Sequence, residues 1–265
     1  MLSQVPALVF CVYRGAQVCR LQELLRKTID YCGGPGVTTC QVGAGAELLR
    51  PSIAARLLYV NQDRPDLVEV WLRVSGDYGV LDAFTTVLKR ESGVAFQVVQ
   101  RSRYSMVIRI LFPREPRCLS CQWCPLTSSP IGSMVRSIVF APDFMLLELL
   151  VAKPQALREL ERRGCSIASN VPLENVDYGL TEKQEYALVQ AFLEGYYSYP
   201  RRVSVKELAS RLRVSSSALA ELLRKAEQRI VEKYVVEELP HYLVQNVLRS
   251  PALLEPRRRG RTGEP

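Results

Sequence analysis

The sequence predicts an α+β protein in which a mostly antiparallel sheet, with helices on one side, is followed by an all-α region. Two observations support this prediction. Apolar residues alternate with polar ones in several short segments between residues 66 and 173, and from residue 181 onward they recur at helical spacing. The chain has 265 residues, enough for two modest domains. We therefore divide it into residues 1–60, 61–173, 180–250 and 251–265.

Residues 1–60 carry the weakest pattern. Leu8 to Tyr13 is compatible with a short strand and Leu21 to Tyr31 with a helix. A glycine-rich break follows at residues 32–36, and residues 38–52 have no usable period. Two interpretations stay open. The segment is a loosely packed extension, or the true start lies near Val60 and the earlier residues are translated upstream sequence.

Residues 61–173 supply the predicted sheet and form what we expect to be a sensor or regulatory domain. The expected strands are Leu67–Val74, Val94–Gln100, Tyr104–Phe112, Ser133–Phe140, Phe144–Val151 and Cys165–Val171, and the expected helices are Tyr78–Arg90 and Pro154–Arg163. Proline suits the first turn of a helix, and Gly164 ends the second one. This layout resembles the small-molecule sensor domains of the ACT or ferredoxin-like kind, a likeness of fold alone.

The segment from residue 180 to 250 predicts three helices. Thr181 with Gln184 and Ser204 with Glu207 have the spacing of capping boxes, so helices should begin just after Thr181 and Ser204. The second helix should end near Leu212, and Ser215 should cap a long third helix from Ser216 to about Val236. We expect the first helix to bury Tyr186, Leu188, Val189, Phe192 and Leu193.

The spacing between the second and third helices is that of a helix-turn-helix. Two helices should meet at a steep angle through Leu208, Ala209, Leu212, Val214, Leu219 and Leu222. Ala209 should be small because the helices cross closely there, and Arg213 should occupy the left-handed turn position that glycine usually takes. The alternative is an ordinary three-helix bundle without a nucleic-acid partner.

A helix-turn-helix places its third helix where the major groove of DNA could receive it. The expected contacts on that helix are Ser215, Ser216, Ser217, Ala220, Glu221 and Arg224. Serines at a helix amino terminus can bind phosphates or base edges. Arg201, Arg202 and Lys206, around the start of the second helix, should contact phosphates.

Several motifs in this region are similar to the bacterio-opsin activator (Bat-type) helix-turn-helix family of archaeal regulators. They are residues 180–184, Gly195-Tyr196-Tyr197, Tyr199-Pro200-Arg201, and Glu207-Leu208-Ala209 through Ser217 to Leu219. Arg213 stands where the family usually has glycine. The resemblance covers residues 180–232. It implies DNA binding and transcription regulation in an archaeon, with a sensor domain whose effector it does not identify.

Eight cysteines suggest thiols or metal ligands rather than a disulfide framework. Cys118, Cys121 and Cys124 form a loop with two overlapping two-residue spacings, and Cys165 could supply a fourth ligand. Such a set could hold zinc or an iron–sulfur cluster. A redox pair that closes a disulfide and inert thiols are the alternatives.

Composition narrows the function classes. The net charge of +8 favours polyanionic partners, although it does not distinguish DNA from RNA or a membrane surface. No apolar run reaches the roughly 18–20 residues of a membrane span, and the amino terminus lacks the order of a signal peptide, so we expect a cytoplasmic protein. The single histidine, His241, should face solvent. Residues 251–265 should form a basic, disordered tail.

Motifs of common enzyme classes are missing from the sequence. There is no nucleophile elbow, phosphate loop or dinucleotide-binding glycine motif, so we expect no enzyme activity. The expected function is a DNA-binding transcriptional regulator whose partners are double-stranded DNA, a small-molecule effector and a second copy in a homodimer. One alternative is a small metal- or redox-binding protein whose helical end contacts other proteins. Another is a nonspecific module that coats RNA or DNA.

Overall fold

The computed structural model describes residues 7–14, 19–35, 40, 52–61, 65–77, 79–114, 133–172, 180–239, 241 and 244. The chain forms two compact units. One contains Met1–Leu173 together with Glu238–Pro265, and the other contains Glu174–Glu237. The predicted α+β class is confirmed, with a sheet in the first unit and helices in the second.

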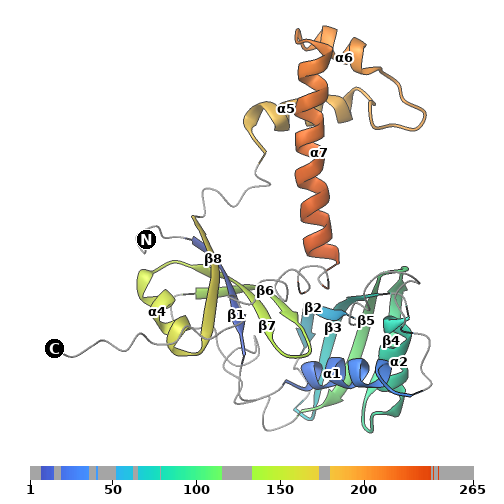
Figure 1. Ribbon diagram of the computed structural model, residues 1–265, viewed down its shortest axis with the longest axis vertical. Helices are drawn as coiled ribbons and strands as arrows, with labels where there is room; N and C mark the ends of the chain where they lie inside the picture. Colours follow the sequence, from blue (N-terminus) through green and yellow to red (C-terminus); the bar gives the residue numbers. More distant parts are fainter. Residues whose placement is uncertain are drawn as a thin grey trace, which may run out of the picture. The chain divides into compact units, whose positions relative to one another are not determined.

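The first unit is built on an eight-stranded sheet in which every pair of neighbours runs antiparallel (Figure 1). The strands are β1 (Ala7–Tyr13), β2 (Ile53–Asn61), β3 (Leu67–Gly76), β4 (Ala95–Arg101), β5 (Ser105–Pro113), β6 (Ser133–Phe140), β7 (Met145–Val151) and β8 (Cys165–Pro172). Their order across the sheet is β4-β5-β3-β2-β6-β7-β1-β8. The helices are α1 (Arg20–Cys32), α2 (Val80–Arg90) and α4 (Pro154–Arg162).

The three helices that the structure describes in this unit pack on one face of the sheet. Alternate residues of β3 and β5, such as Leu72 and Ile108, are fully buried in the same apolar cluster as Leu24 of α1, Phe84 of α2 and Leu160 of α4. The intervening residues of these two strands face the other side. There Glu69 accepts hydrogen bonds from Trp71 Nε1 at 2.9 Å and from Arg109 Nε at 2.6 Å. The period-two pattern of the sequence therefore reflects one covered face and one more polar face.

The described parts of residues 1–60, which are β1, α1 and β2, belong to this fold. The expectation of a loosely packed extension or of translated upstream sequence is therefore wrong for them. Strand β1 pairs with β7 on one side and β8 on the other, and Val9 is fully buried. Strand β2 pairs with both β3 and β6. The weak pattern has a physical reason: β1 lies inside the sheet and is buried on both faces, which replaces alternation by a continuous apolar run.

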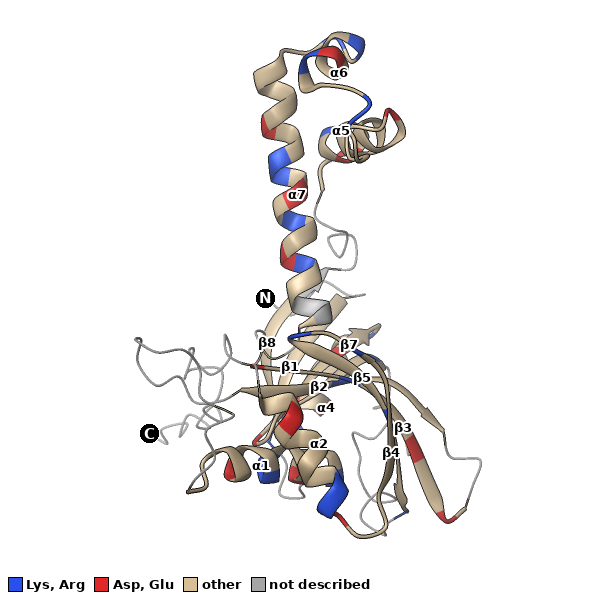
Figure 2. Ribbon diagram, turned by 90° about the vertical axis from the view of Figure 1, so that its right-hand side faces the viewer, with Lys and Arg blue, Asp and Glu red and all other residues tan. Residues whose placement is uncertain are grey.

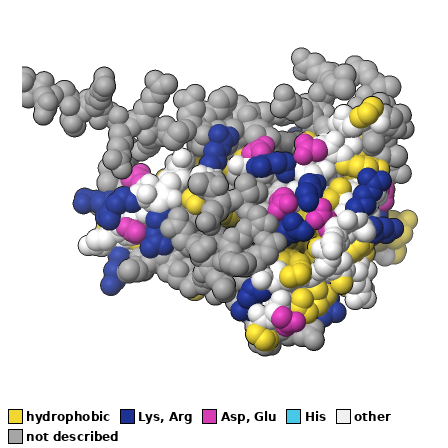
Figure 3. Space-filling view, turned by 90° about the horizontal axis from the view of Figure 1, so that it is seen from below, with side chains coloured by type: hydrophobic (Ala, Val, Ile, Leu, Met, Phe, Trp, Pro, Cys, Tyr) yellow, Lys and Arg dark blue, Asp and Glu magenta, His cyan; other side chains and the backbone are white. Residues whose placement is uncertain are grey.

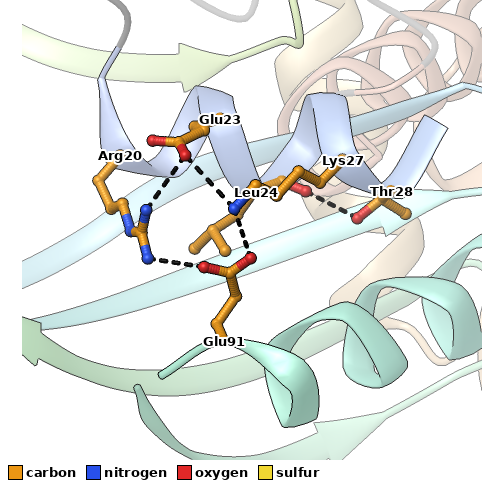
Figure 4. Close-up of polar contacts among 6 residues, drawn as sticks. All are labelled: Arg20, Glu23, Leu24, Lys27, Thr28 and Glu91. Carbon is orange, nitrogen blue, oxygen red and sulfur yellow. Dashed lines mark hydrogen bonds and ion pairs between the residues drawn. The ribbon is translucent and has the colours of Figure 1, made fainter. Parts of the chain in front are cut away.

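Helix α1 is joined to the end of α2 by a cluster of charges (Figure 4). The Glu91 carboxylate lies 2.7 Å from an Arg20 guanidinium nitrogen and 2.5 Å from Lys27 Nζ. Glu23 lies 3.2 Å from Arg20 and 3.4 Å from Lys27. The hydrogen bond with Glu91 raises the pKa of Lys27. These contacts link a helix of the first sixty residues to one from the clearly patterned region.

The segment after residue 238 also belongs to the sheet unit. The boundary of the helical unit therefore lies near residue 238 and not, as expected from the sequence, at residue 250. The His241 amide donates a 3.0 Å hydrogen bond to Ser75 Oγ on β3, and Val244 packs in a second apolar cluster that contains Val12 and Phe144. His241 is fully buried, so the expectation that it faces solvent is wrong. Burial lowers its pKa to about 4, while the carboxylate of Asp77 acts in the opposite direction.

On the side of the sheet unit that carries α1 and α2, the described Lys and Arg side chains alternate with Asp and Glu (Figure 3). Such interspersed charges produce no extended field of one sign among the residues that this view displays.

The second unit contains α5 (Glu182–Leu193), α6 (Val205–Arg211) and α7 (Ser216–Glu238). No helix of the described residues is long and apolar enough to span a membrane.

Candidate nucleic-acid interface

Two capping boxes fix where α5 and α6 begin. The Gln184 amide donates to Thr181 Oγ1 at 3.3 Å, and Gln184 Oε1 accepts from the Thr181 amide at 3.0 Å. At α6 the Glu207 amide donates to Ser204 Oγ at 3.3 Å, and a Glu207 carboxylate oxygen accepts from the Ser204 amide at 2.7 Å. The bond from the Ser204 amide lowers the pKa of Glu207. Both helix starts predicted from the sequence are confirmed.

A tight turn joins α6 to α7. Arg213 adopts a left-handed conformation with φ of 55°, as predicted for the residue at this position. The Val214 amide then donates to the Ala209 carbonyl oxygen at 3.0 Å. Ala209, Leu208 and Leu219 are buried in the core of the unit, with Leu212 and Leu222 partly buried against it. Val214 is 40% exposed and does not join this core, contrary to expectation.

Helix α7 presents most of the predicted DNA contacts on one exposed side. The Ala218 amide donates to Ser215 Oγ at 3.1 Å, so Ser215 caps the helix as predicted. At about 100° per residue, Ser217, Ala220 and Arg224 lie within a sector of roughly 60°. These three residues are exposed, as are Ser215 and Glu221, whereas Ser216 is half-buried. The buried residues Leu219 and Ala226 occupy the opposite side.

Charges alternate in sign along α7 (Figure 2). On its exposed side, Glu221 and Lys225 form an ion pair at 2.6 Å. The hydrogen bond from Lys225 lowers the pKa of the Glu221 carboxyl group. Glu221 is therefore an ionised hydrogen-bond acceptor next to Arg224, a cationic donor. This side of α7 can both accept and donate hydrogen bonds, as the edges of base pairs do.

The loop between α5 and α6 positions the other predicted cations. Arg201 lies with its guanidinium carbon 4.6 Å from the centre of the Tyr196 ring. The Arg202 amide donates to the Gly195 carbonyl oxygen at 3.1 Å. Arg201, Arg202 and Lys206 are all exposed. The structure thus brings two of these cations onto one loop and the third onto the first turn of α6.

Sequence reasoning did not identify the contact that joins this loop to α7. The Tyr197 hydroxyl donates a 2.6 Å hydrogen bond to Glu227 Oε1, about three turns beyond the exposed serines Ser215 and Ser217. Tyr196 and Tyr197 pack edge to face with ring centres 5.0 Å apart. Burial, followed by the bond to Glu227, raises the pKa of Tyr197. The Gly-Tyr-Tyr motif was the available signal, because adjacent aromatic residues in a loop need packing partners.

Helix α5 faces the core with a different side than predicted. The residues that it buries are Gln184, Ala187 and Ala191, whereas Phe192 is 72% exposed and Leu193 is 68% exposed. Tyr186 and Val189 are exposed as well, and Leu188 is half-buried. The prediction of an inward Tyr186, Leu188, Val189, Phe192 and Leu193 face is wrong. Small alanines let α5 approach its neighbours closely, which leaves the large side chains outside.

The expectation of thiols or metal ligands rather than disulfides is wrong for four of the described cysteines, which pair in two disulfides. Cys118, Cys121 and Cys124 lie outside the described residues. Cys165 forms a disulfide with Cys11, with Cα atoms 5.7 Å apart, and Cys32 forms another with Cys40. A disulfide-bonded sulfur offers no thiolate, so Cys165 is not a fourth metal ligand in this structure. In the part of the chain that the structure describes, no three potential metal ligands gather in one place.

Comparison with known proteins supports the helical unit as the functional site. Residues 180–232 match a family described as the HTH DNA binding domain. A stretch of 82 residues, 31% of this chain, is 35% identical to a protein of Haloferax volcanii that is provisionally named a transcriptional regulator. That stretch spans 14% of the relative's length. A search of solved structures found no significant match.

Proposed function

We propose that this protein is a transcriptional regulator that binds duplex DNA in a sequence-dependent way through α7. The observation that carries the proposal is the exposed side of α7 directly after a tight left-handed turn, within the segment that matches the DNA-binding family. In this arrangement α7 enters the major groove, and α6 crosses the DNA backbone in front of it. The provisional name of the Haloferax relative supports the same function.

Each predicted contact has a chemical role in this proposal. Arg224 donates to guanine O6 and N7, and Glu221 accepts from a cytosine amino group. Ala220 offers a methyl group to thymine. Because Lys225 pairs with Glu221 at 2.6 Å, that ion pair has to open or rotate before Glu221 reaches a base. Glu221 therefore selects against base edges that offer it no hydrogen bond in place of the ion pair with Lys225.

Phosphate contacts fix the register of α7 on the duplex. Ser215, Ser216 and Ser217 lie at the amino terminus of a 23-residue helix, where backbone amides and hydroxyls favour an anion. Arg201, Arg202 and Lys206 contribute charge from the loop and from α6. The basic residues beyond Pro256 add further charge in the sequence, outside the described residues.

The sheet unit is proposed as the regulatory half of the molecule. It is a compact unit distinct from the one that contains α5, α6 and α7, which suits a domain that responds to a small-molecule effector and alters DNA binding. We propose a cytoplasmic location in an archaeon, in keeping with the Haloferax relative, and a role without catalysis. The cysteine loop at residues 118–124 remains a candidate site for zinc or an iron–sulfur cluster.

The proposal is tested by comparing the binding of the full chain to its own promoter region and to random duplex, at two salt concentrations. A regulator keeps a preference of on the order of a thousandfold or more for one sequence, whereas a nonspecific coating module shows only the steep salt dependence. Equal affinity for both duplexes would contradict the proposal.

Point variants test the orientation of α7. Arg224→Ala should weaken specific binding by about 1–3 kcal/mol and relax the preference at one base pair. Ser217→Ala tests the amino-terminal contact in the same way. Arg158→Ala is the matched control, because Arg158 is an exposed arginine on α4 of the sheet unit. If both α7 variants bind the promoter as tightly as the parent, α7 does not use this side.

A further inference from the structure

An apolar surface on the helical unit has no role in the proposed DNA contacts. It is a groove of about 470 Å³ between α5 and α7. We call it the α5–α7 face. Its apolar walls are Leu188, Val189 and Phe192 on α5 with Ile230 and Val231 on α7, and the Tyr197–Glu227 pair closes one side.

The α5–α7 face exposes unusually large side chains. Phe192 is 72% exposed and Val231 59%. At the margin of the face, Tyr186, Leu193 and Tyr234 are also mostly exposed. A fully covered aromatic side chain buries roughly 150–250 Å², so covering these residues removes several hundred Å² from water in each copy. This is the order of magnitude of the roughly 800 Å² that each partner contributes to a standard interface.

We infer that the α5–α7 face packs against the same face of a second copy of this chain, about a two-fold axis. The inference rests on the proposed function in one respect, the use of paired sites on DNA. Its chemistry is independent of that function. Among the described residues that line the groove, Glu227 is the only charged one, and it already accepts a 2.6 Å hydrogen bond from Tyr197. Burying the face therefore covers a carboxylate that keeps its partner.

The spacing along α7 fits this arrangement. The predicted base contacts centre on Ala220 and the apolar wall on Ile230, ten residues further along the helix. At 1.5 Å per residue this separation is about 15 Å. If the two α7 helices run antiparallel about a two-fold axis at the α5–α7 face, the two sets of base contacts lie roughly 30 Å apart along the helix axis. Half-sites on successive turns of DNA lie about 34 Å apart.

The direct test is the mass of the full chain in solution, measured by sedimentation equilibrium over a range of micromolar concentrations. We expect a dimer of twice the 29.9 kDa chain. Phe192→Glu and Val231→Glu each bring a charge into the face and should raise the dimer dissociation constant by on the order of tenfold or more. Val99→Glu is the matched control, because Val99 is 50% exposed on β4, and this variant should remain dimeric.

Several outcomes would overturn the inference. One is a parent chain that stays monomeric, which would show that no second copy occupies the face. Another is a dimer that survives both variants. Circular dichroism checks that each variant folds, and Val231→Glu decides the matter if Phe192→Glu does not fold. A dimer broken by these variants but lacking sequence preference supports the interface and contradicts the proposed function. A monomer with strong sequence preference supports the proposed function and contradicts the interface.

Discussion

The hydroxyl of Tyr197 donates a 2.6 Å hydrogen bond to Glu227 Oε1 and so connects the loop after α5 to the middle of α7. This loop also carries Arg201, whose guanidinium group lies over Tyr196. One hydrogen bond therefore links the cations expected to contact phosphate with the helix expected to contact bases. The order of the loop and the position of α7 should depend on each other.

Replacing Tyr197 with phenylalanine removes this hydrogen bond and keeps the ring. We expect a loss of about 0.5–1.5 kcal/mol in unfolding free energy, measured by chemical denaturation. DNA affinity should also fall, because the loop cations lose their fixed position. Tyr199→Phe is the matched control, because the Tyr199 side chain is fully exposed in the same loop. Equal losses in the two variants would contradict a specific role for the Tyr197–Glu227 bond.

Gly195 should resist substitution. Its φ is +78°, and a Cβ atom there would lie 2.7 Å from Arg202 Cδ and 3.0 Å from Arg202 Cβ. We expect Gly195→Ala to lower stability by about 1–3 kcal/mol. Gly33→Ala is the contrasting variant, because Gly33 has φ of −83° and no atom nearer than 3.7 Å to an added Cβ. Thermal unfolding of the two variants should differ clearly, and similar melting temperatures would refute this explanation.

Glu91 holds α1 against the end of α2, so Glu91→Gln should destabilise the sheet unit. Two cations, Arg20 and Lys27, lie within 2.7 Å of its carboxylate, and its side chain is only 14% exposed. We expect a loss of about 1–2 kcal/mol in unfolding free energy. The control is Asp82→Asn, which breaks an exposed ion pair with Arg101 and should cost at most about 0.5 kcal/mol.

His241 should make the stability of the sheet unit depend on pH. Its pKa is about 4 in the folded chain, below the ordinary 6.5, because burial penalises the charged form. The unfolded chain therefore binds the proton first, and stability present above about pH 6.5 is lost as the pH falls toward 4. The full difference is about 3 kcal/mol.

Denaturation curves at several pH values check this, with His241→Gln as the reference. The variant lacks the titrating ring, so the difference in unfolding free energy between parent and variant should change between pH 6.5 and 4. A difference that stays constant over this range would mean that the ring is not buried as a neutral group.

The cysteine loop allows a separate prediction about metal. If Cys118, Cys121 and Cys124 bind zinc, the purified protein should hold about one metal ion per chain, and Cys121→Ser should release it. Cys165→Ser should leave the metal content unchanged, because Cys165 pairs with Cys11. Elemental analysis measures this content. Metal-free protein whose three loop thiols all react with an alkylating reagent would exclude the site.

Local sequence patterns determined much of this protein. The capping boxes at Thr181 and Ser204, the turn at Arg213 and the strands from Leu67 onward were all predictable. Each depends on the chemistry of a few neighbouring residues. A side chain three residues away caps a helix, and alternation marks a strand with one covered face.

Tertiary packing decided what these local rules leave open. The position of β1 between β7 and β8, and the burial of His241 beside β3, both depend on contacts between residues more than a hundred positions apart. Helix α5 has two sides that could face inward, one lined by Phe192 and one by Ala187 and Ala191. The sequence favoured the larger apolar side, but the small side permits the closer approach of neighbouring helices, and only the assembled core selects between them.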